Sequence, residues 1–229
     1  MSAKFFETGV RGLDIMMGGG IRWGSTVSIA SDLVERVSLC HQFVENALER
    51  GFIINYWCFK EAPERVRYIM EEESGIHVEK YEKERQLQFF TPLETEITRN
   101  LQDSSQLLKV FNDFTNDAMK RVALHVMGGK KVMFVLNNVS SLNDLLHEDP
   151  RWKDFTTKGS TWLRKLVKVI SIQICDLKDL EDAEALADFC IVMKNIDGIP
   201  YIKATKVSTS GWVPYILSEK GIEIAEAFL

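Results

Sequence analysis

The spacing of hydrophobic residues switches repeatedly between two periods along the chain. Short runs with few polar residues, typical of buried strands, alternate with segments in which apolar residues recur every three or four positions, as on one helix face. This pattern predicts strands at residues 26–30, 53–59, 87–90, 132–136, 169–174, 189–193, 201–207 and 213–217. It predicts helices at residues 33–49, 62–73, 104–127, 157–168 and 181–187.

The strand predicted at 132–136 reads VMFVL, without a polar residue. A continuous apolar strand is covered on both faces, so the alternation favours an α/β fold with a largely parallel central sheet sandwiched by helices and a β-rich C-terminal end. We find no internal repeat and no linker rich in proline, glycine or serine. We therefore expect one domain over residues 1–229.

Composition and charge narrow the classes of protein further. The 229 residues carry a net charge of −5, which argues against a general polyanion binder. No apolar run approaches the roughly 20 residues that cross a bilayer, and residues 1–12 lack the basic and apolar blocks of a signal peptide, so we expect a cytoplasmic location and no membrane partner. The four cysteines stand apart within apolar stretches, which indicates buried reduced thiols, and neither they nor the four histidines are spaced as metal ligands.

Residues 8–31 read TGVRGLDIMMGGGIRWGSTVSIAS. This segment resembles the opening of KaiC-like and archaeal RadA-like proteins, which are P-loop ATPases with a RecA-like fold. The matching positions are Thr8, Gly9, Gly12, Leu13, Asp14, Gly18, Gly19, Gly20 and Gly24. The resemblance extends over about residues 6–225 and implies a RecA-like fold for the chain.

The same resemblance implies a phosphate-binding loop after the strand at 26–30. In that family the loop reads GxxxxGK[ST], because its backbone N–H groups cradle phosphates and its lysine reaches the β and γ oxygens. Here the segment reads SDLVERVS, and Ser31, Asp32, Glu35, Arg36 and Ser38 stand at the degenerate positions, without a glycine or a lysine. The spacing of Asp32 and Glu35 matches a capping box, so we expect their carboxylates to cap the next helix in place of phosphate.

Two further family elements are also altered. Where active relatives carry paired glutamates that polarise the attacking water, this chain has Lys60 and Glu61, so Glu61 is a vestigial catalytic position that the neighbouring ammonium would hold as an ion pair. Where they carry the Walker B aspartate, this chain has Asn137, whose amide lacks the negative charge that Mg²⁺ prefers. A family K-x-R segment that reaches the neighbouring subunit's ATP falls near Lys206, without the arginine.

These departures favour a protein that is not an enzyme and binds no cofactor and no metal. We expect a scaffold or regulator that binds a protein or peptide, such as an active paralogue, and that forms homo- or hetero-oligomers. A sheet edge could also take up an extended peptide by strand addition.

Two alternatives stay open at this point. A residual ATP-binding protein or weak ATPase would use Arg36, Ser38 and Glu61. A nucleic-acid accessory factor would use a basic segment in which aromatic residues stand between the charges and could stack on bases. The residues of this candidate nucleic-acid patch are Arg151, Trp152, Lys153, Lys158, Arg164 and Lys165, with Phe155 beside them.

Overall fold

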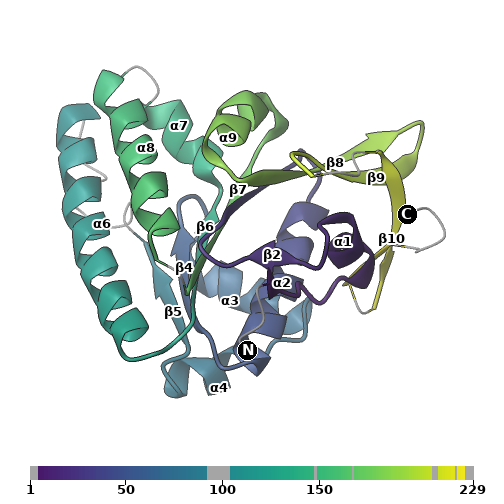
Figure 1. Cartoon of the computed structure of the whole chain (residues 1–229), viewed down its shortest axis with the longest axis horizontal. Helices are drawn as coiled ribbons and strands as arrows, with labels where there is room; N and C mark the ends of the chain where they lie inside the picture. The colour runs from purple at the N-terminus through teal and green to yellow at the C-terminus, as the bar shows by residue number, and fades with distance from the viewer. Residues whose placement is uncertain are drawn as a thin grey trace.

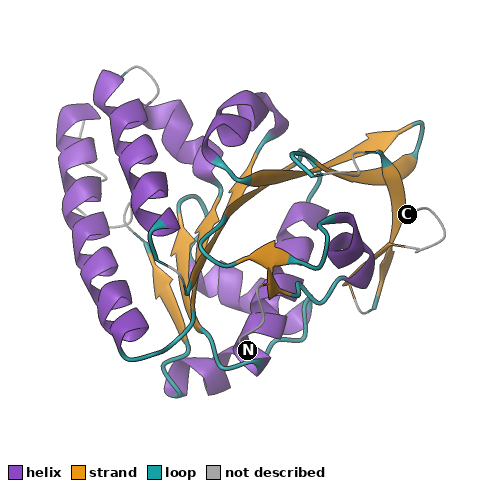
Figure 2. Cartoon of the chain, in the orientation of Figure 1, coloured by secondary structure: helices purple, strands orange, loops and turns teal. Residues whose placement is uncertain are grey.

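A long, twisted sheet runs through the molecule, with helices on both of its faces (Figures 1 and 2). The computed structural model describes residues 5–91, 104–146, 149–166, 168–207, 211–219 and 221–224. In chain order, the strands of this sheet are β3 (Thr26–Ala30), β4 (Ile53–Cys58), β5 (Leu87–Phe90), β6 (Val132–Asn137), β7 (Val169–Cys175), β8 (Phe189–Ile196), β9 (Ile199–Ala204), β10 (Val213–Ser218) and β11 (Gly221–Ile224).

Within the described residues the strands lie in the order β11-β10-β9-β8-β3-β7-β6-β4-β5. The six strands from β8 to β5 are parallel, whereas β9, β10 and β11 are antiparallel to their neighbours. The change follows from the connections. Helices link the parallel strands, while Asp197 and Gly198, both with positive φ, form the tight turn between β8 and β9. The predicted largely parallel α/β sheet with a β-rich C-terminal end is confirmed.

Two groups of helices cover the two faces of the sheet (Figure 1). The first face carries α1 (Arg11–Met16), α2 (Glu35–Glu49), α3 (Pro63–Glu72) and α4 (Val78–Lys83). The second face carries α6 (Ser104–Met127), α7 (Val139–Leu146), α8 (Pro150–Arg164) and α9 (Leu180–Leu186), with the short 3-10 helix η1 (Leu177–Asp179) before α9. Among the described residues, no helix is both long and apolar enough to span a membrane.

The two faces have different cores. The first face is a continuous aliphatic cluster in which Val27, Ile29 and Ile172 are fully buried beneath α2. The second face is more aromatic. The ring of Trp57 in the sheet contacts the ring of Phe134 on the neighbouring strand and the ring of Phe111 on α6. All four cysteines are free and buried, as predicted.

The glycine-rich opening motif forms a structural framework. Its strand β2 (Ile21–Arg22) pairs with β1 (Phe5–Phe6), which lies just before the motif, in a small two-stranded sheet. Asp14 of α1 accepts a hydrogen bond from the Thr8 backbone N–H at 2.8 Å. A Cβ at Gly20, where φ is 110°, would lie 2.3 Å from the carbonyl oxygen of Phe6, so only glycine fits this turn.

Two sequence predictions need correction. The helix predicted at 157–168 is α8, which begins at Pro150 because Asp149 accepts a hydrogen bond from the backbone N–H of Arg151 and proline suits the first helical position. The segment after β6, which we predicted as a polar loop, contains α7. The polar residues at 140, 141, 143 and 144 obscure the helical spacing of its two buried leucines, Leu142 and Leu146.

Candidate functional site

Four connections meet at the carboxyl edge of the parallel sheet, where the family resemblance places an ATPase site. They follow β3, β7, β6 and β4, which are consecutive neighbours in the sheet. The structure thereby places Glu61 and Asn137 on adjoining connections, after β4 and at the end of β6, and Arg36 after β3, on the far side of β7. We call this region the carboxyl-edge site.

The guanidinium group of Arg36 fills the space between the β3–α2 loop and the end of β7. It donates hydrogen bonds to the backbone carbonyls of Ser31 and Cys175 and forms an ion pair with Asp176 at 2.7 Å. The Ser31 N–H also donates to the Cys175 carbonyl, at 3.1 Å. These contacts fix the loop to the end of β7.

Asp32 does not cap α2 as we predicted. Its Oδ1 accepts a hydrogen bond from the backbone N–H of Leu177, at the start of η1, at 3.1 Å. The residue at the N-cap of α2 is Val34, and no side chain caps the helix there. The capping-box prediction was wrong because Asp32 stands two residues before the N-cap and reaches across to η1, while the Ser31 hydroxyl accepts from the Leu33 N–H within the loop.

Glu61 and Asn137 form a direct contact. The Asn137 Nδ2 donates a hydrogen bond to Glu61 Oε2 at 3.2 Å, and Asn137 is only 4% exposed. We expected Lys60 to hold the glutamate, but Lys60 is exposed and the structure pairs Glu61 with the amide instead. The two positions that the family resemblance assigns to water and Mg²⁺ are thus hydrogen-bonded to each other.

The β6–α7 connection completes this network. Asn138 adopts a left-handed conformation at φ 63°, which asparagine tolerates better than most residues, and its Oδ1 accepts hydrogen bonds from the N–H and hydroxyl of Ser141. The Ser140 hydroxyl accepts from the backbone N–H of Asp176 at 2.8 Å. Asp176 therefore links α7, β7 and Arg36.

Lys206 is used within its own chain. Its Nζ donates hydrogen bonds to the carbonyls of Glu184 and Ala187 at the end of α9, the latter at 2.8 Å. A cation at a helix C-terminus satisfies carbonyls that lack intrahelical partners. The contact holds the β9–β10 connection against α9.

The candidate nucleic-acid residues occupy α8 and the position after it. Trp152 is 7% exposed, stacks on Phe155 at 5.7 Å and donates its indole N–H to Asn143 at 3.0 Å. The ion pairs of this segment join Arg151 to Asp149, Lys158 to Asp154 and Arg164 to Asp188. Lys153 and Lys165 are exposed. The structure thus places the two aromatic residues against the core. Three of the five basic candidates form ion pairs with carboxylates.

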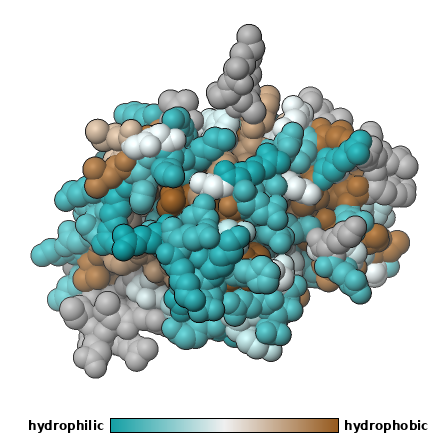
Figure 3. Space-filling view, turned by 90° about the horizontal axis from the view of Figure 1, so that it is seen from below, coloured by the Kyte–Doolittle hydropathy of each residue, from teal (hydrophilic) through white to brown (hydrophobic). Residues whose placement is uncertain are grey.

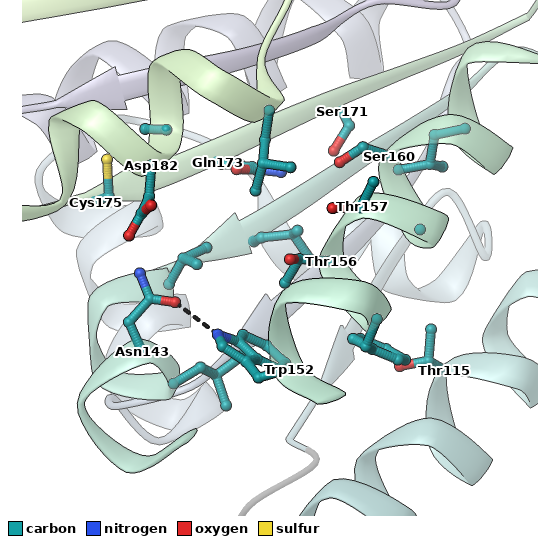
Figure 4. A pocket seen from close by; sticks show the side chains of 18 of the residues that line it. Thr115, Asn143, Trp152, Thr156, Thr157, Ser160, Ser171, Gln173, Cys175 and Asp182 are labelled. Carbon is teal, nitrogen blue, oxygen red and sulfur yellow. Dashed lines mark hydrogen bonds between the residues drawn. The ribbon is translucent and has the colours of Figure 1, made fainter. Parts of the chain in front are cut away.

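A cavity of about 560 Å³ on the second face escaped the sequence analysis. It lies between β6 and β7 of the sheet and the helices α8 and α9 (Figure 4). The signal in the sequence is the run TTKGST, residues 156–161, which puts small residues where an amphipathic helix usually carries large apolar ones. Among the described residues, no group of three or more His, Cys, Asp or Glu side chains could hold a metal ion.

The architecture is that of a KaiC-like protein fold. The structure is similar to that of a KaiC-like protein from the hyperthermophilic archaeon Pyrococcus horikoshii, with a TM-score of 0.73 and 21% sequence identity over 96% of this chain and 98% of that chain. At this identity the likeness shows the fold alone. No protein-family model and no curated protein matches the chain.

Proposed function

We propose that this chain is a RecA-fold protein that has lost ATP chemistry and acts by binding another protein. The observation that carries the proposal is Arg36. Its guanidinium donates hydrogen bonds to two backbone carbonyls and forms an ion pair with Asp176, so this cation near the expected phosphate position already has its acceptors. Releasing it would leave the 31%-exposed carboxylate of Asp176 without its partner.

The residues of the carboxyl-edge site do not fit Mg-ATP. The β3–α2 loop lacks glycine, and Asp32 adds a carboxylate where a triphosphate would need positive potential. Asn137 donates its amide N–H to Glu61, which ties up the carboxylate that would otherwise activate water. Three positions that cooperate in an ATPase are each engaged in another contact.

An apolar patch supports the protein-binding half of the proposal. Ile199 on β9 and Ile216 on β10 are 49% and 63% exposed, while Leu217, which is 58% exposed, follows Ile216 on β10 and therefore projects from the other face of the sheet. They lie at the antiparallel end of the sheet, where the view from below shows apolar surface at the right (Figure 3). Exposed apolar side chains on neighbouring strands suit docking of a second subunit, which is either another copy of this chain or a RecA-like paralogue.

Thermal unfolding with and without millimolar Mg-ATP tests the loss of nucleotide binding. A ligand that binds only the folded state raises the melting temperature by mass action, so we expect no rise with Mg-ATP or Mg-ADP beyond that of magnesium sulfate. A rise of several degrees would overturn the proposal and favour the residual ATP-binding alternative through Arg36, Ser38 and Glu61.

Light scattering over a range of protein concentrations tests the docking surface. We expect self-association that Ile216→Lys abolishes and that Leu124→Lys preserves, because Leu124 is 69% exposed on α6, at the opposite end of the sheet. A monomer at all concentrations would exclude a second copy and leave the paralogue as the partner.

The nucleic-acid alternative draws support only from the exposed lysines of the α8 segment. Phosphate neutralisation weakens steeply with salt, so affinity for a single-stranded oligonucleotide at two salt concentrations would reveal it. We expect no salt-dependent binding, because Trp152 and Phe155 face the core.

A further inference from the structure

The cavity on the second face has two chemically different ends. Toward β4 and β6 its wall is apolar and aromatic, with Trp57, Phe134 and Phe155 among the lining side chains. Toward β7 and α9 the lining is polar, with Ser171 and Gln173 on the sheet and the carboxylates of Asp179 and Asp182 at or near α9. Figure 4 shows the hydroxyl groups of Ser160 and Ser171 directed toward one another across this space.

The cavity exists because facing positions of α8 and β7 both carry small side chains. Gly159 and Ser160 lie on the same inward side of α8 as the buried Trp152 and Leu163. A Cβ built at Gly159 would meet no atom within 4 Å. Protein interiors are normally close-packed, so a space of about 560 Å³ at this position results from the small side chains that face one another here. Its volume falls within the range of small-molecule sites.

Several buried polar atoms on the lining have no hydrogen-bond partner among the described residues. They include the Ser171 hydroxyl, the Trp57 indole N–H and the Asp179 Oδ2, and Ser171 and Trp57 are only 1% and 2% exposed. Buried polar groups are almost always paired, and leaving one unpaired is costly. These atoms need partners that the described part of the chain does not supply.

The carboxylate of Asp179 indicates the charge of the missing hydrogen-bond partner. Its Oδ1 accepts a hydrogen bond from Asn143 at 3.2 Å, but its buried Oδ2 faces no donor among the described residues. Of the cations that line the cavity, Arg164 is held by Asp188 and by the Leu186 carbonyl, and Lys153 is exposed. The Asp179 carboxylate therefore requires a hydrogen-bond donor that carries positive charge, whereas the Trp57 indole N–H requires an acceptor.

We propose that this cavity is a binding site for a small aromatic amine, whose ring packs among Trp57, Phe134 and Phe155 and whose ammonium group binds Asp179. The site lies on the opposite face of the sheet from α2, and it is independent of whether the carboxyl-edge site binds nucleotide. It adds a small-molecule ligand to the protein-binding role proposed above.

Tryptamine is the probe, and indole and indole-3-acetate are its matched neutral and anionic analogues. With the full chain, isothermal titration calorimetry should show tryptamine binding at least about tenfold more tightly than indole, since a hydrogen-bonded charge contact contributes that much or more. Indole-3-acetate should bind more weakly than either. Absence of tryptamine binding at millimolar concentration, or tighter binding of the acid than of the amine, would overturn the proposal.

Variants place the probe in this cavity. Asp179→Asn keeps the side-chain shape and should weaken tryptamine about tenfold while leaving indole within about twofold, because only the charge contact is lost. Glu181→Gln removes a charge from the same stretch of α9 but does not line the cavity, so it should change neither affinity. Equal effects of the two variants would contradict the assignment of Asp179.

Gly159→Leu provides a test that does not depend on the carboxylate. The leucine should occupy the open space and abolish binding of both tryptamine and indole, whereas Gly159→Ala should retain it. Both variants should remain folded, with melting temperatures at or above that of the original chain, which separates lost binding from lost structure. Undiminished tryptamine binding by folded Gly159→Leu would show that the amine binds elsewhere and would overturn the proposal.

Discussion

The two faces of strands β3 and β7 differ although they are formed by alternate residues of the same segments. On the first face, Val27, Ile29 and Ile172 are fully buried in an aliphatic cluster. On the second face, Thr26 and Ser171 are equally buried, yet each has a hydroxyl without a hydrogen-bond partner among the described residues. A strand that is covered on both sides usually carries apolar residues on both.

The aliphatic positions of these strands stabilise the fold, whereas the hydroxyl-bearing positions leave unfilled volume beside the sheet. The aliphatic face gains stability from each buried methyl group. The hydroxyl face gains little, because its groups were removed from water without full replacement of their hydrogen bonds. Small polar residues inside an otherwise apolar sheet therefore indicate a site.

Replacing adjacent residues of β7 should give the largest contrast. Ile172→Ala should lower the free energy of unfolding by about 2–5 kcal/mol, because it leaves a cavity in a close-packed cluster. Ser171→Ala should change it by less than about 1 kcal/mol, because the hydroxyl that it removes has no partner to lose. Urea unfolding measures both, and equal losses would contradict the distinction between the faces.

Acid should destabilise the aliphatic face through His41 of α2. Its ring nitrogens lie 2.9 Å from the Ser74 hydroxyl and 3.2 Å from the Tyr56 hydroxyl, and burial lowers its pKa from 6.5 to about 3. The unfolded chain binds a proton below pH 6.5 that the folded chain binds only near pH 3. His41 therefore contributes stability that is present above pH 6.5 and is lost, by about 1.4 kcal/mol per pH unit, as the pH falls toward 3.

The variant His41→Gln should flatten this part of the stability profile relative to the original chain, as measured by urea unfolding between pH 7 and pH 4. His77→Gln is the control, because His77 is exposed. If both variants kept the original pH dependence, another group would be responsible for it.

The smallest expected effect is a gain on the second face. Gly159→Ala should raise the free energy of unfolding by about 0.5–1 kcal/mol, because alanine favours the helix and its Cβ enters open space. Gly128→Ala is a comparison near the end of α6, where the added Cβ would lie 3.4 Å from two backbone carbonyl oxygens. Destabilisation by Gly159→Ala would mean that the cavity wall is closed in solution.

Most of the fold followed from local pattern. The apolar runs predicted β3, β4, β6 and β7 within one or two residues, and the helical period predicted α6 at its observed bounds. Helix α7 was missed because four of its residues are polar and only two leucines contact the core. Helix α8 begins earlier than predicted because its N-cap residue, Asp149, lies outside the segment with a helical hydrophobic period. Both errors fall where capping and tertiary packing outweigh periodicity.

The candidate sites likewise combine features that residue types predict with contacts that only the tertiary structure decides. The absence of a glycine and a lysine from the segment SDLVERVS, and the amide at Asn137, could be read directly from residue types. The contact between Asn137 and Glu61 could be anticipated only from the family resemblance, and the capture of Arg36 by Asp176 could not, since 140 residues separate two groups that meet across adjacent strands.

The sequence by itself determined the parallel α/β architecture, the buried thiols and the departures from a phosphate-binding loop, because each of these is written in residue type and local spacing. Only the tertiary structure decided which contacts fix the β3–α2 loop and where the chain leaves an unfilled space. Arg36 has its acceptors because β3 lies beside β7, and the cavity arises because small residues of α8 lie over small residues of β7. Both outcomes depend on which strands and helices become neighbours, and periodicity along one segment carries no information about that choice.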